Sequence, residues 1–279
     1  MSDYIIEERV IDNHRIRIYP DYDSCCPVTN WDMAARYLFE YNDRYYHNLH
    51  IECNWRDWFS EDRHSMEEAL RYMAASVVAQ KDMVNYLKKG NIDGIRFVYN
   101  RHERQWELQH KCDCGMHKGE WMTDLEIEPY DLKKYDNRGE LVENMEKDDL
   151  IALIRDCAKD FVIKEWSTTG YSQGDYVEGV AYMSKKRYDE MVGNTDKPWK
   201  EHALDLIDME VKELGMWMWG DVKGYVLEKK VPFTKVYDDD REDEEDVEWE
   251  EVGSCWGFYM EADELIEEVI SEYGLKETS

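Results

Sequence analysis

The chain has 279 residues, and its 64 aspartates and glutamates against 35 lysines and arginines give a formal net charge of −29. A polyanion of this kind is repelled by nucleic acids and by anionic membranes, so the charge argues against a protein that binds either of them directly. Hydrophobic residues make up 43% of the chain and aromatic residues 13%, which is enough to bury a core and argues against global disorder.

The first half of the chain predicts two hairpins and two helices. Residues alternate on either side of Asp12-Asn13, as in a β-hairpin, and Ser65 with Glu68 forms a capping box at the start of an amphipathic helix. A second hairpin surrounds a turn rich in arginine and histidine. The expected elements are a hairpin of 5–11 and 14–19, a short helix of 31–41, a helix of 66–89 and a hairpin of 95–99 and 105–109.

The second half predicts helices and strands in an irregular order. One helix begins near Asp196, with Pro198 in its first turn, and is expected to end just before Gly215. The other expected helices are 148–161, 184–192 and 261–273, and the expected strands are 175–183, 216–231 (a strand or a bulged hairpin) and 252–259.

Because strands and helices do not alternate regularly, the expected fold class is α+β, with mixed antiparallel sheets and several amphipathic helices. Residues 1–120 carry a net charge of −5 and residues 121–279 a net charge of −24. We therefore expect a near-neutral N-terminal α+β region of 1–120, a polar connecting segment of 121–147 and an acidic C-terminal α+β domain of 148–279.

Seven cysteines are present, an odd number, and the N-terminal residues lack the basic and apolar regions of a signal peptide. No stretch approaches the roughly eighteen apolar residues that a membrane-spanning helix needs. We expect a soluble, intracellular protein with reduced thiols.

The most acidic segment runs from Asp238 to Glu251, where eleven of the fourteen residues are Asp or Glu. Such a run is either a solvated, disordered loop or, together with the acidic helices that flank it in sequence, a surface that imitates the phosphates of DNA and attracts a basic partner. The acids expected on the helix before Gly215 are Asp205, Asp208, Glu210 and Glu213. The residues expected to bind the partner, with nearby aromatic residues as anchors, are Asp238, Asp239, Asp240, Asp243, Glu244, Glu245, Asp246, Glu264, Glu267 and Glu268.

One loop has the residues of a structural zinc site: His110, Cys112, Cys114 and His117 supply four nitrogen and sulfur ligands within eight residues. The Cys-x-Cys spacing is tighter than the usual Cys-x₂-Cys, and the residues could equally be ordinary loop residues. A second cluster, formed by His47, His50 and Cys53, could share the same ion.

No motif in the sequence identifies a reaction. Asp175 and Asp221 each follow a glycine and could hold a divalent metal in a nucleotide- or DNA-processing enzyme. Cys255 has no histidine after it in the chain, so a buried structural cysteine is the simpler interpretation. Phosphate-binding glycine loops and nucleophile elbows do not occur. We expect a protein that is not an enzyme.

Three aromatic strings resemble acidic accessory proteins of tailed bacteriophages. They are YSQGDY at 171–176, WGDVKGYV at 219–226 and SCWGFY at 254–259, with a weaker match over residues 22–41. The resemblance covers about the last 120 residues well and the first 60 loosely. Glycines within aromatic strands suggest fold signatures, at positions where backbones pass closely.

The nearest named group that this resemblance suggests is the anti-Gabija proteins. It implies a phage-encoded, non-enzymatic inhibitor that acts in the host bacterial cytoplasm as a homo-oligomer. Its partner would be a basic nuclease–helicase defence complex, whose access to DNA it would block by mimicry or by enclosure. The alternatives are the metal-dependent enzyme and a zinc-stabilised structural module. No cofactor is expected apart from that structural zinc.

Overall fold

The computed structural model describes residues 4–30, 33–42, 65–169, 176–193, 195–235 and 244–276. The chain divides into two compact units: Met1–Trp31 with Val211–Ser279, called here the terminal unit, and Asp32–Glu210, called the inserted unit. The second boundary lies within helix α8 (Trp199–Met218). Among the described helices, none is both long and apolar enough to cross a bilayer.

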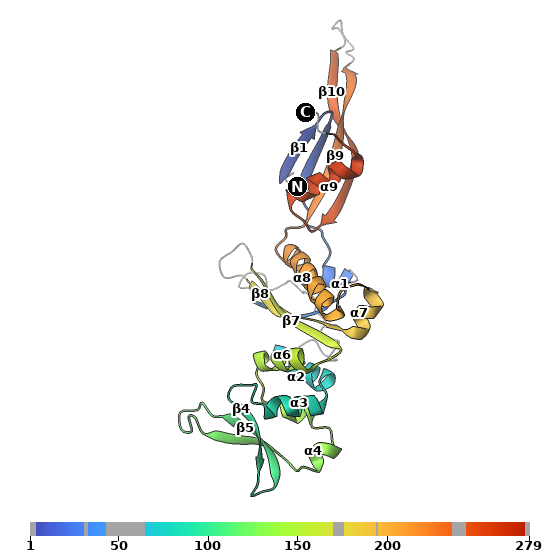
Figure 1. Cartoon of the computed structure of the whole chain (residues 1–279). Helices are drawn as coiled ribbons and strands as arrows, with labels where there is room; N and C mark the ends of the chain where they lie inside the picture. Colours follow the sequence, from blue (N-terminus) through green and yellow to red (C-terminus); the bar gives the residue numbers. More distant parts are fainter. Residues whose placement is uncertain are drawn as a thin grey trace. The chain divides into compact units, whose positions relative to one another are not determined.

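The terminal unit is built on a four-stranded antiparallel sheet (Figure 1). The strand order is β1-β2-β9-β10, so β9 is paired on both sides. The elements are β1 (Glu7–Ile11), β2 (His14–Pro20), β9 (Lys223–Lys235), β10 (Glu244–Phe258), α1 (Pro27–Asn30) and α9 (Ala262–Tyr273).

Helix α9 covers one face of this sheet. Because side chains alternate between the two faces of a strand, every second side chain points toward the helix. The helix has an apolar stripe that packs against these side chains. The buried residues that meet there are Ile11, Ile16, Ile18, Tyr225 and Leu227 from the strands and Leu265, Ile266 and Val269 from α9. Each fully buried aliphatic side chain contributes about 1.5–3 kcal/mol, so this small core holds the unit together.

The aromatic strings at 219–226 and 254–259 meet as paired strands. Gly224 of β9 lies directly opposite Trp256 of β10, and a Cβ at position 224 would come within 2.1 Å of the indole ring. The glycine therefore makes room for a tryptophan side chain, where a close approach of two backbones was expected. The two strings are one structural feature.

The inserted unit contains two three-stranded antiparallel sheets, which confirms the α+β class. One sheet has the order β3-β8-β7, from β3 (Arg36–Asn42), β8 (Tyr176–Ser184) and β7 (Phe161–Thr169). The other is β4-β5-β6, from β4 (Ile95–Asn100), β5 (Gln105–Lys111) and β6 (Trp121–Ile127). The helices are α2 (Met66–Val77), α3 (Gln80–Lys88), α4 (Asp131–Lys134), α5 (Arg138–Val142), α6 (Lys147–Cys157), α7 (Lys185–Met191) and the first part of α8.

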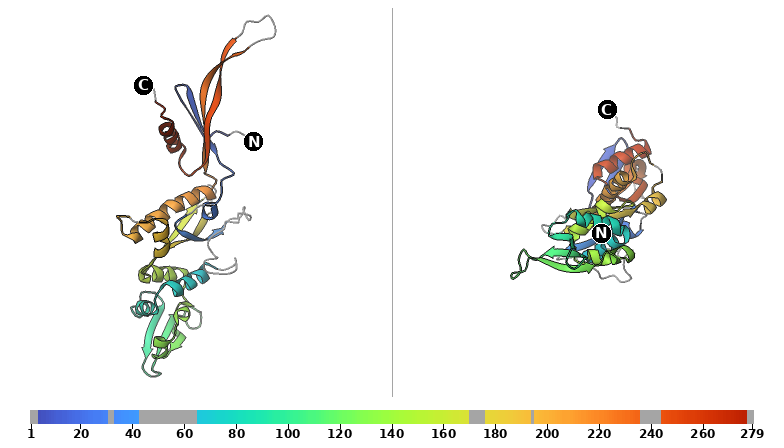
Figure 2. Two further views of the ribbon diagram at one scale, coloured as in Figure 1. Left: turned by 90° about the vertical axis from the view of Figure 1, so that its right-hand side faces the viewer. Right: turned by 60° about the horizontal axis from the view of Figure 1, so that its bottom comes forward.

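Helices α2, α3 and α6 lie between the two sheets of the inserted unit, as Figures 1 and 2 show from different sides. Their apolar faces form one continuous core with residues of both sheets, including Leu38, Leu70, Leu108, Ile154 and Val180. The core is therefore shared, and neither sheet is a separate domain.

Two charged side chains fasten the segment before β3. Glu210 of α8 accepts hydrogen bonds from the backbone N–H groups of Ala34 (2.6 Å) and Ala35 (3.0 Å) and from the Tyr37 hydroxyl (2.7 Å). Arg187 donates to the carbonyl oxygens of Met33 (2.6 Å) and Ala34 (2.7 Å). Backbone N–H and carbonyl groups that β-pairing does not satisfy thus form hydrogen bonds with charged side chains. Such hydrogen bonds are stronger than those between neutral groups.

Many expected elements are confirmed: both early hairpins, the strand ending at Ser184, the short helix that Ser184 caps and the final helix. The side chain of Ser65 accepts from the Glu68 backbone N–H at 3.2 Å, as the capping box predicts. The single helix expected over 66–89 is interrupted, because Val78 and Ala79 have extended backbones and the Val78 side chain is fully buried.

Other expectations were wrong. The helix expected over 31–41 is strand β3 from Arg36, in which Tyr37, Leu38 and Phe39 are all buried, and a continuous apolar run does not separate strand from helix. The helix expected to end before Gly215 continues to Met218, so the next strand begins only at Lys223. Helix α6 ends at Cys157, and Phe161 begins β7.

Residues 121–147 form structure and not a connection. They contain β6, α4 and α5, and Leu141, Val142 and Met145 are buried in the core of the inserted unit. The compact units also differ from the three expected regions, since the structure is not divided at residues 120 and 147. Changes in composition along the sequence can indicate only regions that are continuous in the chain. The terminal unit instead combines two distant segments through β-pairing.

We predict that Gly179→Ala destabilises the protein more than Gly224→Ala. A Cβ at position 179 would lie 2.2 Å from the backbone oxygen of Leu38, which cannot move without breaking the β3–β8 pairing, whereas Trp256 can rotate away from position 224. In urea unfolding, Gly179→Ala should lower the free energy of unfolding by about 3 kcal/mol and Gly224→Ala by about 1 kcal/mol. Gly139→Ala, in open space on α5, is the control and should be neutral or stabilising. Equal losses for Gly179 and Gly224 would contradict the assignment.

We also predict that Glu210→Gln lowers the free energy of unfolding by about 2 kcal/mol, because it removes charge-assisted acceptors from two backbone N–H groups and a hydroxyl. Glu201→Gln, an exposed position on the same helix, should change it by less than about 0.5 kcal/mol. If the two variants unfold alike in urea, the tether at Glu210 contributes nothing.

Candidate functional site

The outer half of the β9–β10 pair forms a two-stranded ribbon. Pairing of β2 with β9 ends at His14↔Lys229, whereas β10 continues along β9 to Glu244↔Lys235. Figure 1 shows the two strands extending past β1 and β2. Residues 229–235 of β9 and 244–250 of β10 are called here the acidic ribbon.

Carboxylates form a row on one face of the acidic ribbon. Asp246, Glu248 and Glu250 alternate along β10, and they lie opposite Phe233, Val231 and Lys229, which follow Leu227 on the face that α9 covers further along. Alternate residues of a strand are about 6.8 Å apart, roughly twice the axial rise between phosphates in one DNA strand. Glu248 and Glu250 are exposed. The acidic ribbon therefore presents regularly spaced negative charge on an extended backbone.

Lysines of β9 offset part of this charge. Lys235 forms an ion pair with Asp246, and its hydrogen bond lowers the pKa of Asp246 below the ordinary value. Lys229 lies directly opposite Glu250. Opposite charges on neighbouring strands stabilise the pair, which favours the extended conformation over a disordered loop.

The other face of the sheet carries arginines and aromatic rings. The Arg15 guanidinium lies 4.6 Å from the centre of the Trp249 ring. The ring centres of Tyr19 and Trp256 lie 6.2 Å apart. Trp256 is 49% exposed. Tryptophan, tyrosine and arginine are the residues that most often dominate protein interfaces, so this face suits a protein partner.

A buried carboxylate holds the arginines in place. Glu228 of β9 is 6% exposed and accepts hydrogen bonds from Arg15 (2.6 Å) and from Arg17. Burial alone would raise the pKa of Glu228, but the hydrogen bonds from the two arginines outweigh it and lower the pKa below its ordinary value. Glu228 is thus a structural anion within the sheet.

Helix α9 adds a second set of acids to the terminal unit. Its apolar stripe faces the sheet, and Asp263, Glu264, Glu267, Glu268 and Glu272 are exposed. Arg9 of β1 pairs with Glu267 at 2.5 Å and lies 3.6 Å from Asp263. The remaining acids of α9 face solvent.

The structure brings most of the described partner-binding residues into one unit. Glu245 and Asp246 lie on opposite faces of the acidic ribbon, and Glu264, Glu267 and Glu268 lie on α9. Glu244 is the first residue of β10, although its side chain is not described. Asp238, Asp239, Asp240 and Asp243 lie outside the described residues.

Three acids of α8 form hydrogen bonds or ion pairs within the inserted unit. Glu210 binds the segment before β3, Asp208 forms an ion pair with Lys164, and Asp205 forms one with Lys197 at 2.7 Å. All three lie on α8, as expected, and their contribution to a partner-binding surface stays a prediction. Helical periodicity identifies an exposed face but not the cations that fold onto it.

The loop between β5 and β6 contains the expected zinc ligands. Cys112 and Cys114 have their sulfur atoms 2.9 Å apart, but the His110 ring bonds to Asp124 (2.6 Å) and the His117 ring to Glu120 (3.0 Å). Within the described part of the chain, no three His, Cys, Asp or Glu residues converge as metal ligands. His47, His50 and Cys53 lie outside that part. A structural zinc stays a prediction.

The two cysteines of this loop differ in acidity. The hydrogen bond that Cys112 donates to Cys114 lowers the pKa of Cys114 and raises that of Cys112, and the backbone N–H of His117 adds to the effect on Cys114. Sequence reasoning singled out these residues as metal ligands and did not foresee a direct contact between the two thiols.

The expected carboxylate site is not assembled from described residues. Asp221 accepts a hydrogen bond from the ammonium of Lys223 at 2.7 Å, and that lysine is 3% exposed. Asp221 therefore compensates a buried cation, and Asp175 lies outside the described residues. Cys255 is exposed on β10, so its expected burial was wrong.

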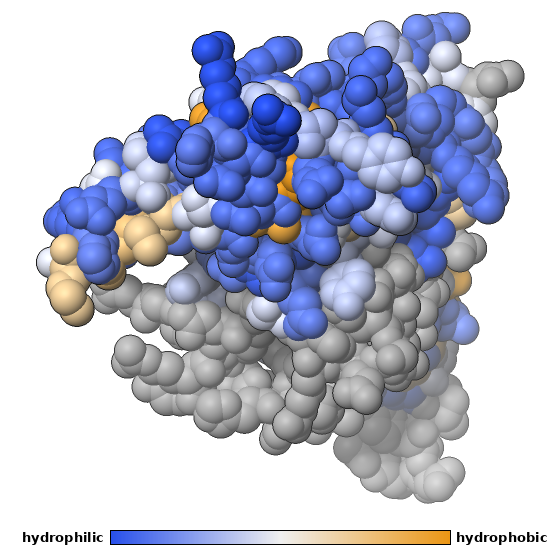
Figure 3. Space-filling view, turned by 90° about the horizontal axis from the view of Figure 1, so that it is seen from below, coloured by the Kyte–Doolittle hydropathy of each residue, from blue (hydrophilic) through white to orange (hydrophobic). Residues whose placement is uncertain are grey.

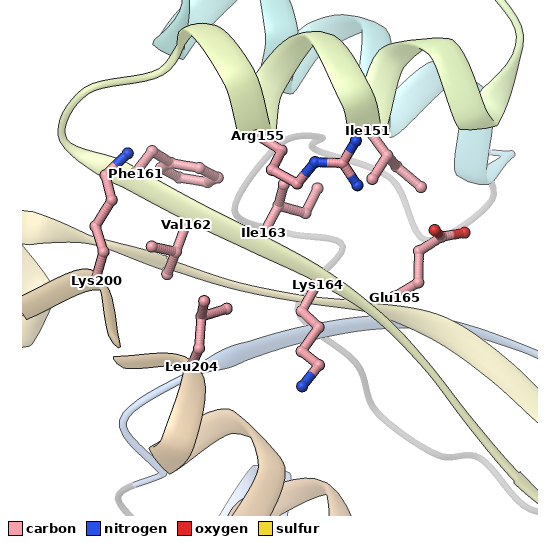
Figure 4. A pocket seen from close by; sticks show the side chains of 9 residues that line it. All are labelled: Ile151, Arg155, Phe161, Val162, Ile163, Lys164, Glu165, Lys200 and Leu204. Carbon is pink, nitrogen blue, oxygen red and sulfur yellow. The ribbon is translucent and has the colours of Figure 1, made fainter. Parts of the chain in front are cut away.

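A hollow of about 380 Å³ lies within the inserted unit between α6, β7 and α8 (Figure 4). Its walls include Phe161 and Leu204, and Arg155, Lys164 and Lys200 stand around it. Lys164 is paired with Asp208, and Lys200 donates to the Ala158 carbonyl oxygen at 2.7 Å. Lys164 and Lys200 therefore already have partners within the inserted unit.

In the view of Figure 3 the coloured surface is mainly hydrophilic, with apolar residues scattered among polar ones. Isolated exposed apolar residues of this kind are normal for a protein surface. That face suggests no apolar binding site.

Comparison with protein-family models, with curated proteins and with solved structures finds no match for this chain. The candidate site therefore depends on its geometry and charge.

The pKa of Glu228 generates a pH prediction. A carboxylate whose pKa is lowered in the folded state contributes stability above its unfolded value of 4.5, and that stability is lost as the pH falls through the lowered value. At pH 7, Glu228→Gln should cost about 2 kcal/mol, and the difference from the parent protein should shrink below pH 4.5. Urea unfolding across this range tests it. Glu251→Gln, the exposed position opposite Glu228, is the control and should change the free energy of unfolding at pH 7 by less than about 0.5 kcal/mol.

Proposed function

We propose that the protein is a phage-encoded, non-enzymatic inhibitor of a bacterial anti-phage defence complex, of the anti-Gabija kind. Its partner would be the basic, DNA-handling nuclease of that complex, and binding would block access to DNA. The row of exposed carboxylates on the acidic ribbon carries this proposal, because it places negative charge at regular intervals on a projecting, hydrogen-bonded element.

The distribution of charge between the units supports the terminal unit as the binding element. Its 100 residues contain 27 Asp and Glu against 10 Lys and Arg, whereas the 179 residues of the inserted unit contain 37 against 25. A surface of dense negative charge attracts a basic cleft over several Å and raises the association rate, an effect that salt screens. A groove evolved to hold DNA is such a cleft.

Charge would provide attraction, and the aromatic face would provide the contacts that hold the complex. Trp249 and Trp256 lie on the sheet face opposite the carboxylate row, beside Arg15 and Arg17. A partner that covers both faces of the sheet would meet the carboxylate row on one face and these tryptophans, with Glu245, on the other. Large rings that become buried in an interface usually account for most of its binding energy.

The remaining parts of the proposal follow from the phage-protein resemblance. The inhibitor would act in the host bacterial cytoplasm as a homo-oligomer, and it would need neither a cofactor nor a catalytic residue. Its direct partner would be a protein and not nucleic acid, which a chain of net charge −29 repels.

We predict that reversing three acids of the acidic ribbon abolishes inhibition. The variant Glu245→Lys/Glu248→Lys/Glu250→Lys should lower the association rate with a DNA-cleaving defence complex by about tenfold or more at low salt. DNA binding by that complex should recover. Stopped-flow association and a DNA-binding assay measure the two effects, and urea unfolding shows whether the variant is still folded.

The matched control is Glu126→Lys/Glu143→Lys/Glu201→Lys, which makes the same change in net charge at exposed positions of the inserted unit. It should retain inhibition. Equal loss in both variants would mean that total charge matters and the acidic ribbon does not. Full inhibition by the ribbon variant would remove the proposal.

A further inference from the structure

The Cys112/Cys114 loop has a geometry that neither the fold nor the proposed inhibition requires. Cys112 closes the β5–β6 hairpin: its backbone N–H donates to the Glu120 carbonyl oxygen at 2.8 Å, and its own carbonyl oxygen accepts from the Gly119 N–H at 2.7 Å. These hydrogen bonds fix the position of Cys112, and the turn that follows places Cys114 beside it. The two sulfur atoms lie 2.9 Å apart.

The two sulfur atoms differ in their hydrogen bonds and in their exposure. The Cys114 sulfur accepts hydrogen bonds from the Cys112 thiol and from the His117 backbone N–H at 3.4 Å, whereas Cys112 acts as the donor. Cys112 is only partly exposed. Cys114 is exposed, so a small molecule can reach it.

The same thiols open onto an acidic hollow of about 560 Å³. Both cysteines line it, and so do Asp93, Asp113, Asp124, Glu146 and Asp149, against a single lysine, Lys111. Negative charge of this density repels anionic reagents and attracts cationic ones, by an amount that falls as salt is added.

We propose that Cys112 and Cys114 form a redox-active dithiol, oxidised to an intramolecular disulfide by cationic or neutral low-molecular-weight disulfides in preference to anionic ones. In the first step the Cys114 thiolate attacks one sulfur of the disulfide R–S–S–R. The bond between its two sulfurs breaks, and one R–S⁻ leaves and takes up a proton from solvent.

In the second step the Cys112 thiol loses its proton to solvent and attacks the Cys114 sulfur of the mixed disulfide. The second R–S⁻ leaves and is protonated. Two protein thiols are thereby oxidised by two electrons, and one disulfide is reduced to two thiols. The sulfurs must approach from 2.9 Å to about 2.0 Å, a small movement for two side chains of one turn.

The test uses the full chain, reduced and then exposed to equal concentrations of cystamine, 2-hydroxyethyl disulfide or glutathione disulfide at low ionic strength. Peptide mass spectrometry should find a Cys112–Cys114 disulfide forming faster than modification of the exposed Cys255. Each rate is divided by the rate at which the same disulfide oxidises dithiothreitol. After this correction, cystamine should react with the protein about tenfold faster than glutathione disulfide. Added salt should reduce this preference.

Two variants assign the roles. Cys112→Ser should accumulate a mixed disulfide on Cys114, because the resolving thiol is gone, and Cys114→Ser should react about tenfold more slowly at Cys112. The proposal is overturned if Cys114 reacts no faster than Cys255, if oxidation pairs other cysteines, or if the rates ignore the charge of the disulfide. None of these readouts depends on the defence partner, so the inhibitor proposal and the dithiol proposal fail separately.

Discussion

Pairing of opposite charges across β9 and β10 is the interaction on which the acidic ribbon depends. In an isolated strand with the composition of 244–251, repulsion between the carboxylates would destabilise the strand. Lys229 and Lys235 on the neighbouring strand offset that repulsion, and β9 is itself fixed by pairing with β2 and by the core under α9. The charged ladder can therefore extend beyond the part of the sheet that has a hydrophobic core.

The carboxylates of this protein divide into two populations. Glu210, Glu228 and Asp221 act as internal acceptors, for backbone N–H groups, arginines and a buried lysine respectively. The exposed acids of β10 and α9 have few such neighbours and produce the external field. Net charge alone counts both populations equally, and only the second can attract a partner.

The fold class and many single elements were predictable, because local signals determine them. Asp12-Asn13, Ser65 and Pro198 are turn and cap residues whose effect does not depend on distant contacts. The failures have a common physical origin in long-range packing. Residues 37–39 are a strand because β8 lies beside them, and Leu141 and Val142 are core because α2 lies beside them.

The candidate site shows the same limit. Sequence identified the acidic run, but its conversion into a ribbon depends on a register with β9 that places Gly224 opposite Trp256. It identified the loop cysteines, but as metal ligands, since the 2.9 Å contact between thiols results from the turn geometry. Paired acids such as Asp205 and Asp208 could not be separated from free ones, because the helical pattern does not show that Lys197, just before the helix, and Lys164 of β7 fold onto them.

The position of the inserted unit within the chain has a consequence for biosynthesis. Strand β2 is translated nearly two hundred residues before its neighbour β9, since residues 32–210 lie between them in the sequence. A nascent β1–β2 hairpin must therefore wait on the ribosome with one edge unsatisfied and with Ile16 and Ile18 uncovered. Arg9, Arg15 and Arg17 place cationic side chains on that hairpin, and charged residues beside apolar ones oppose the self-association of an incomplete sheet.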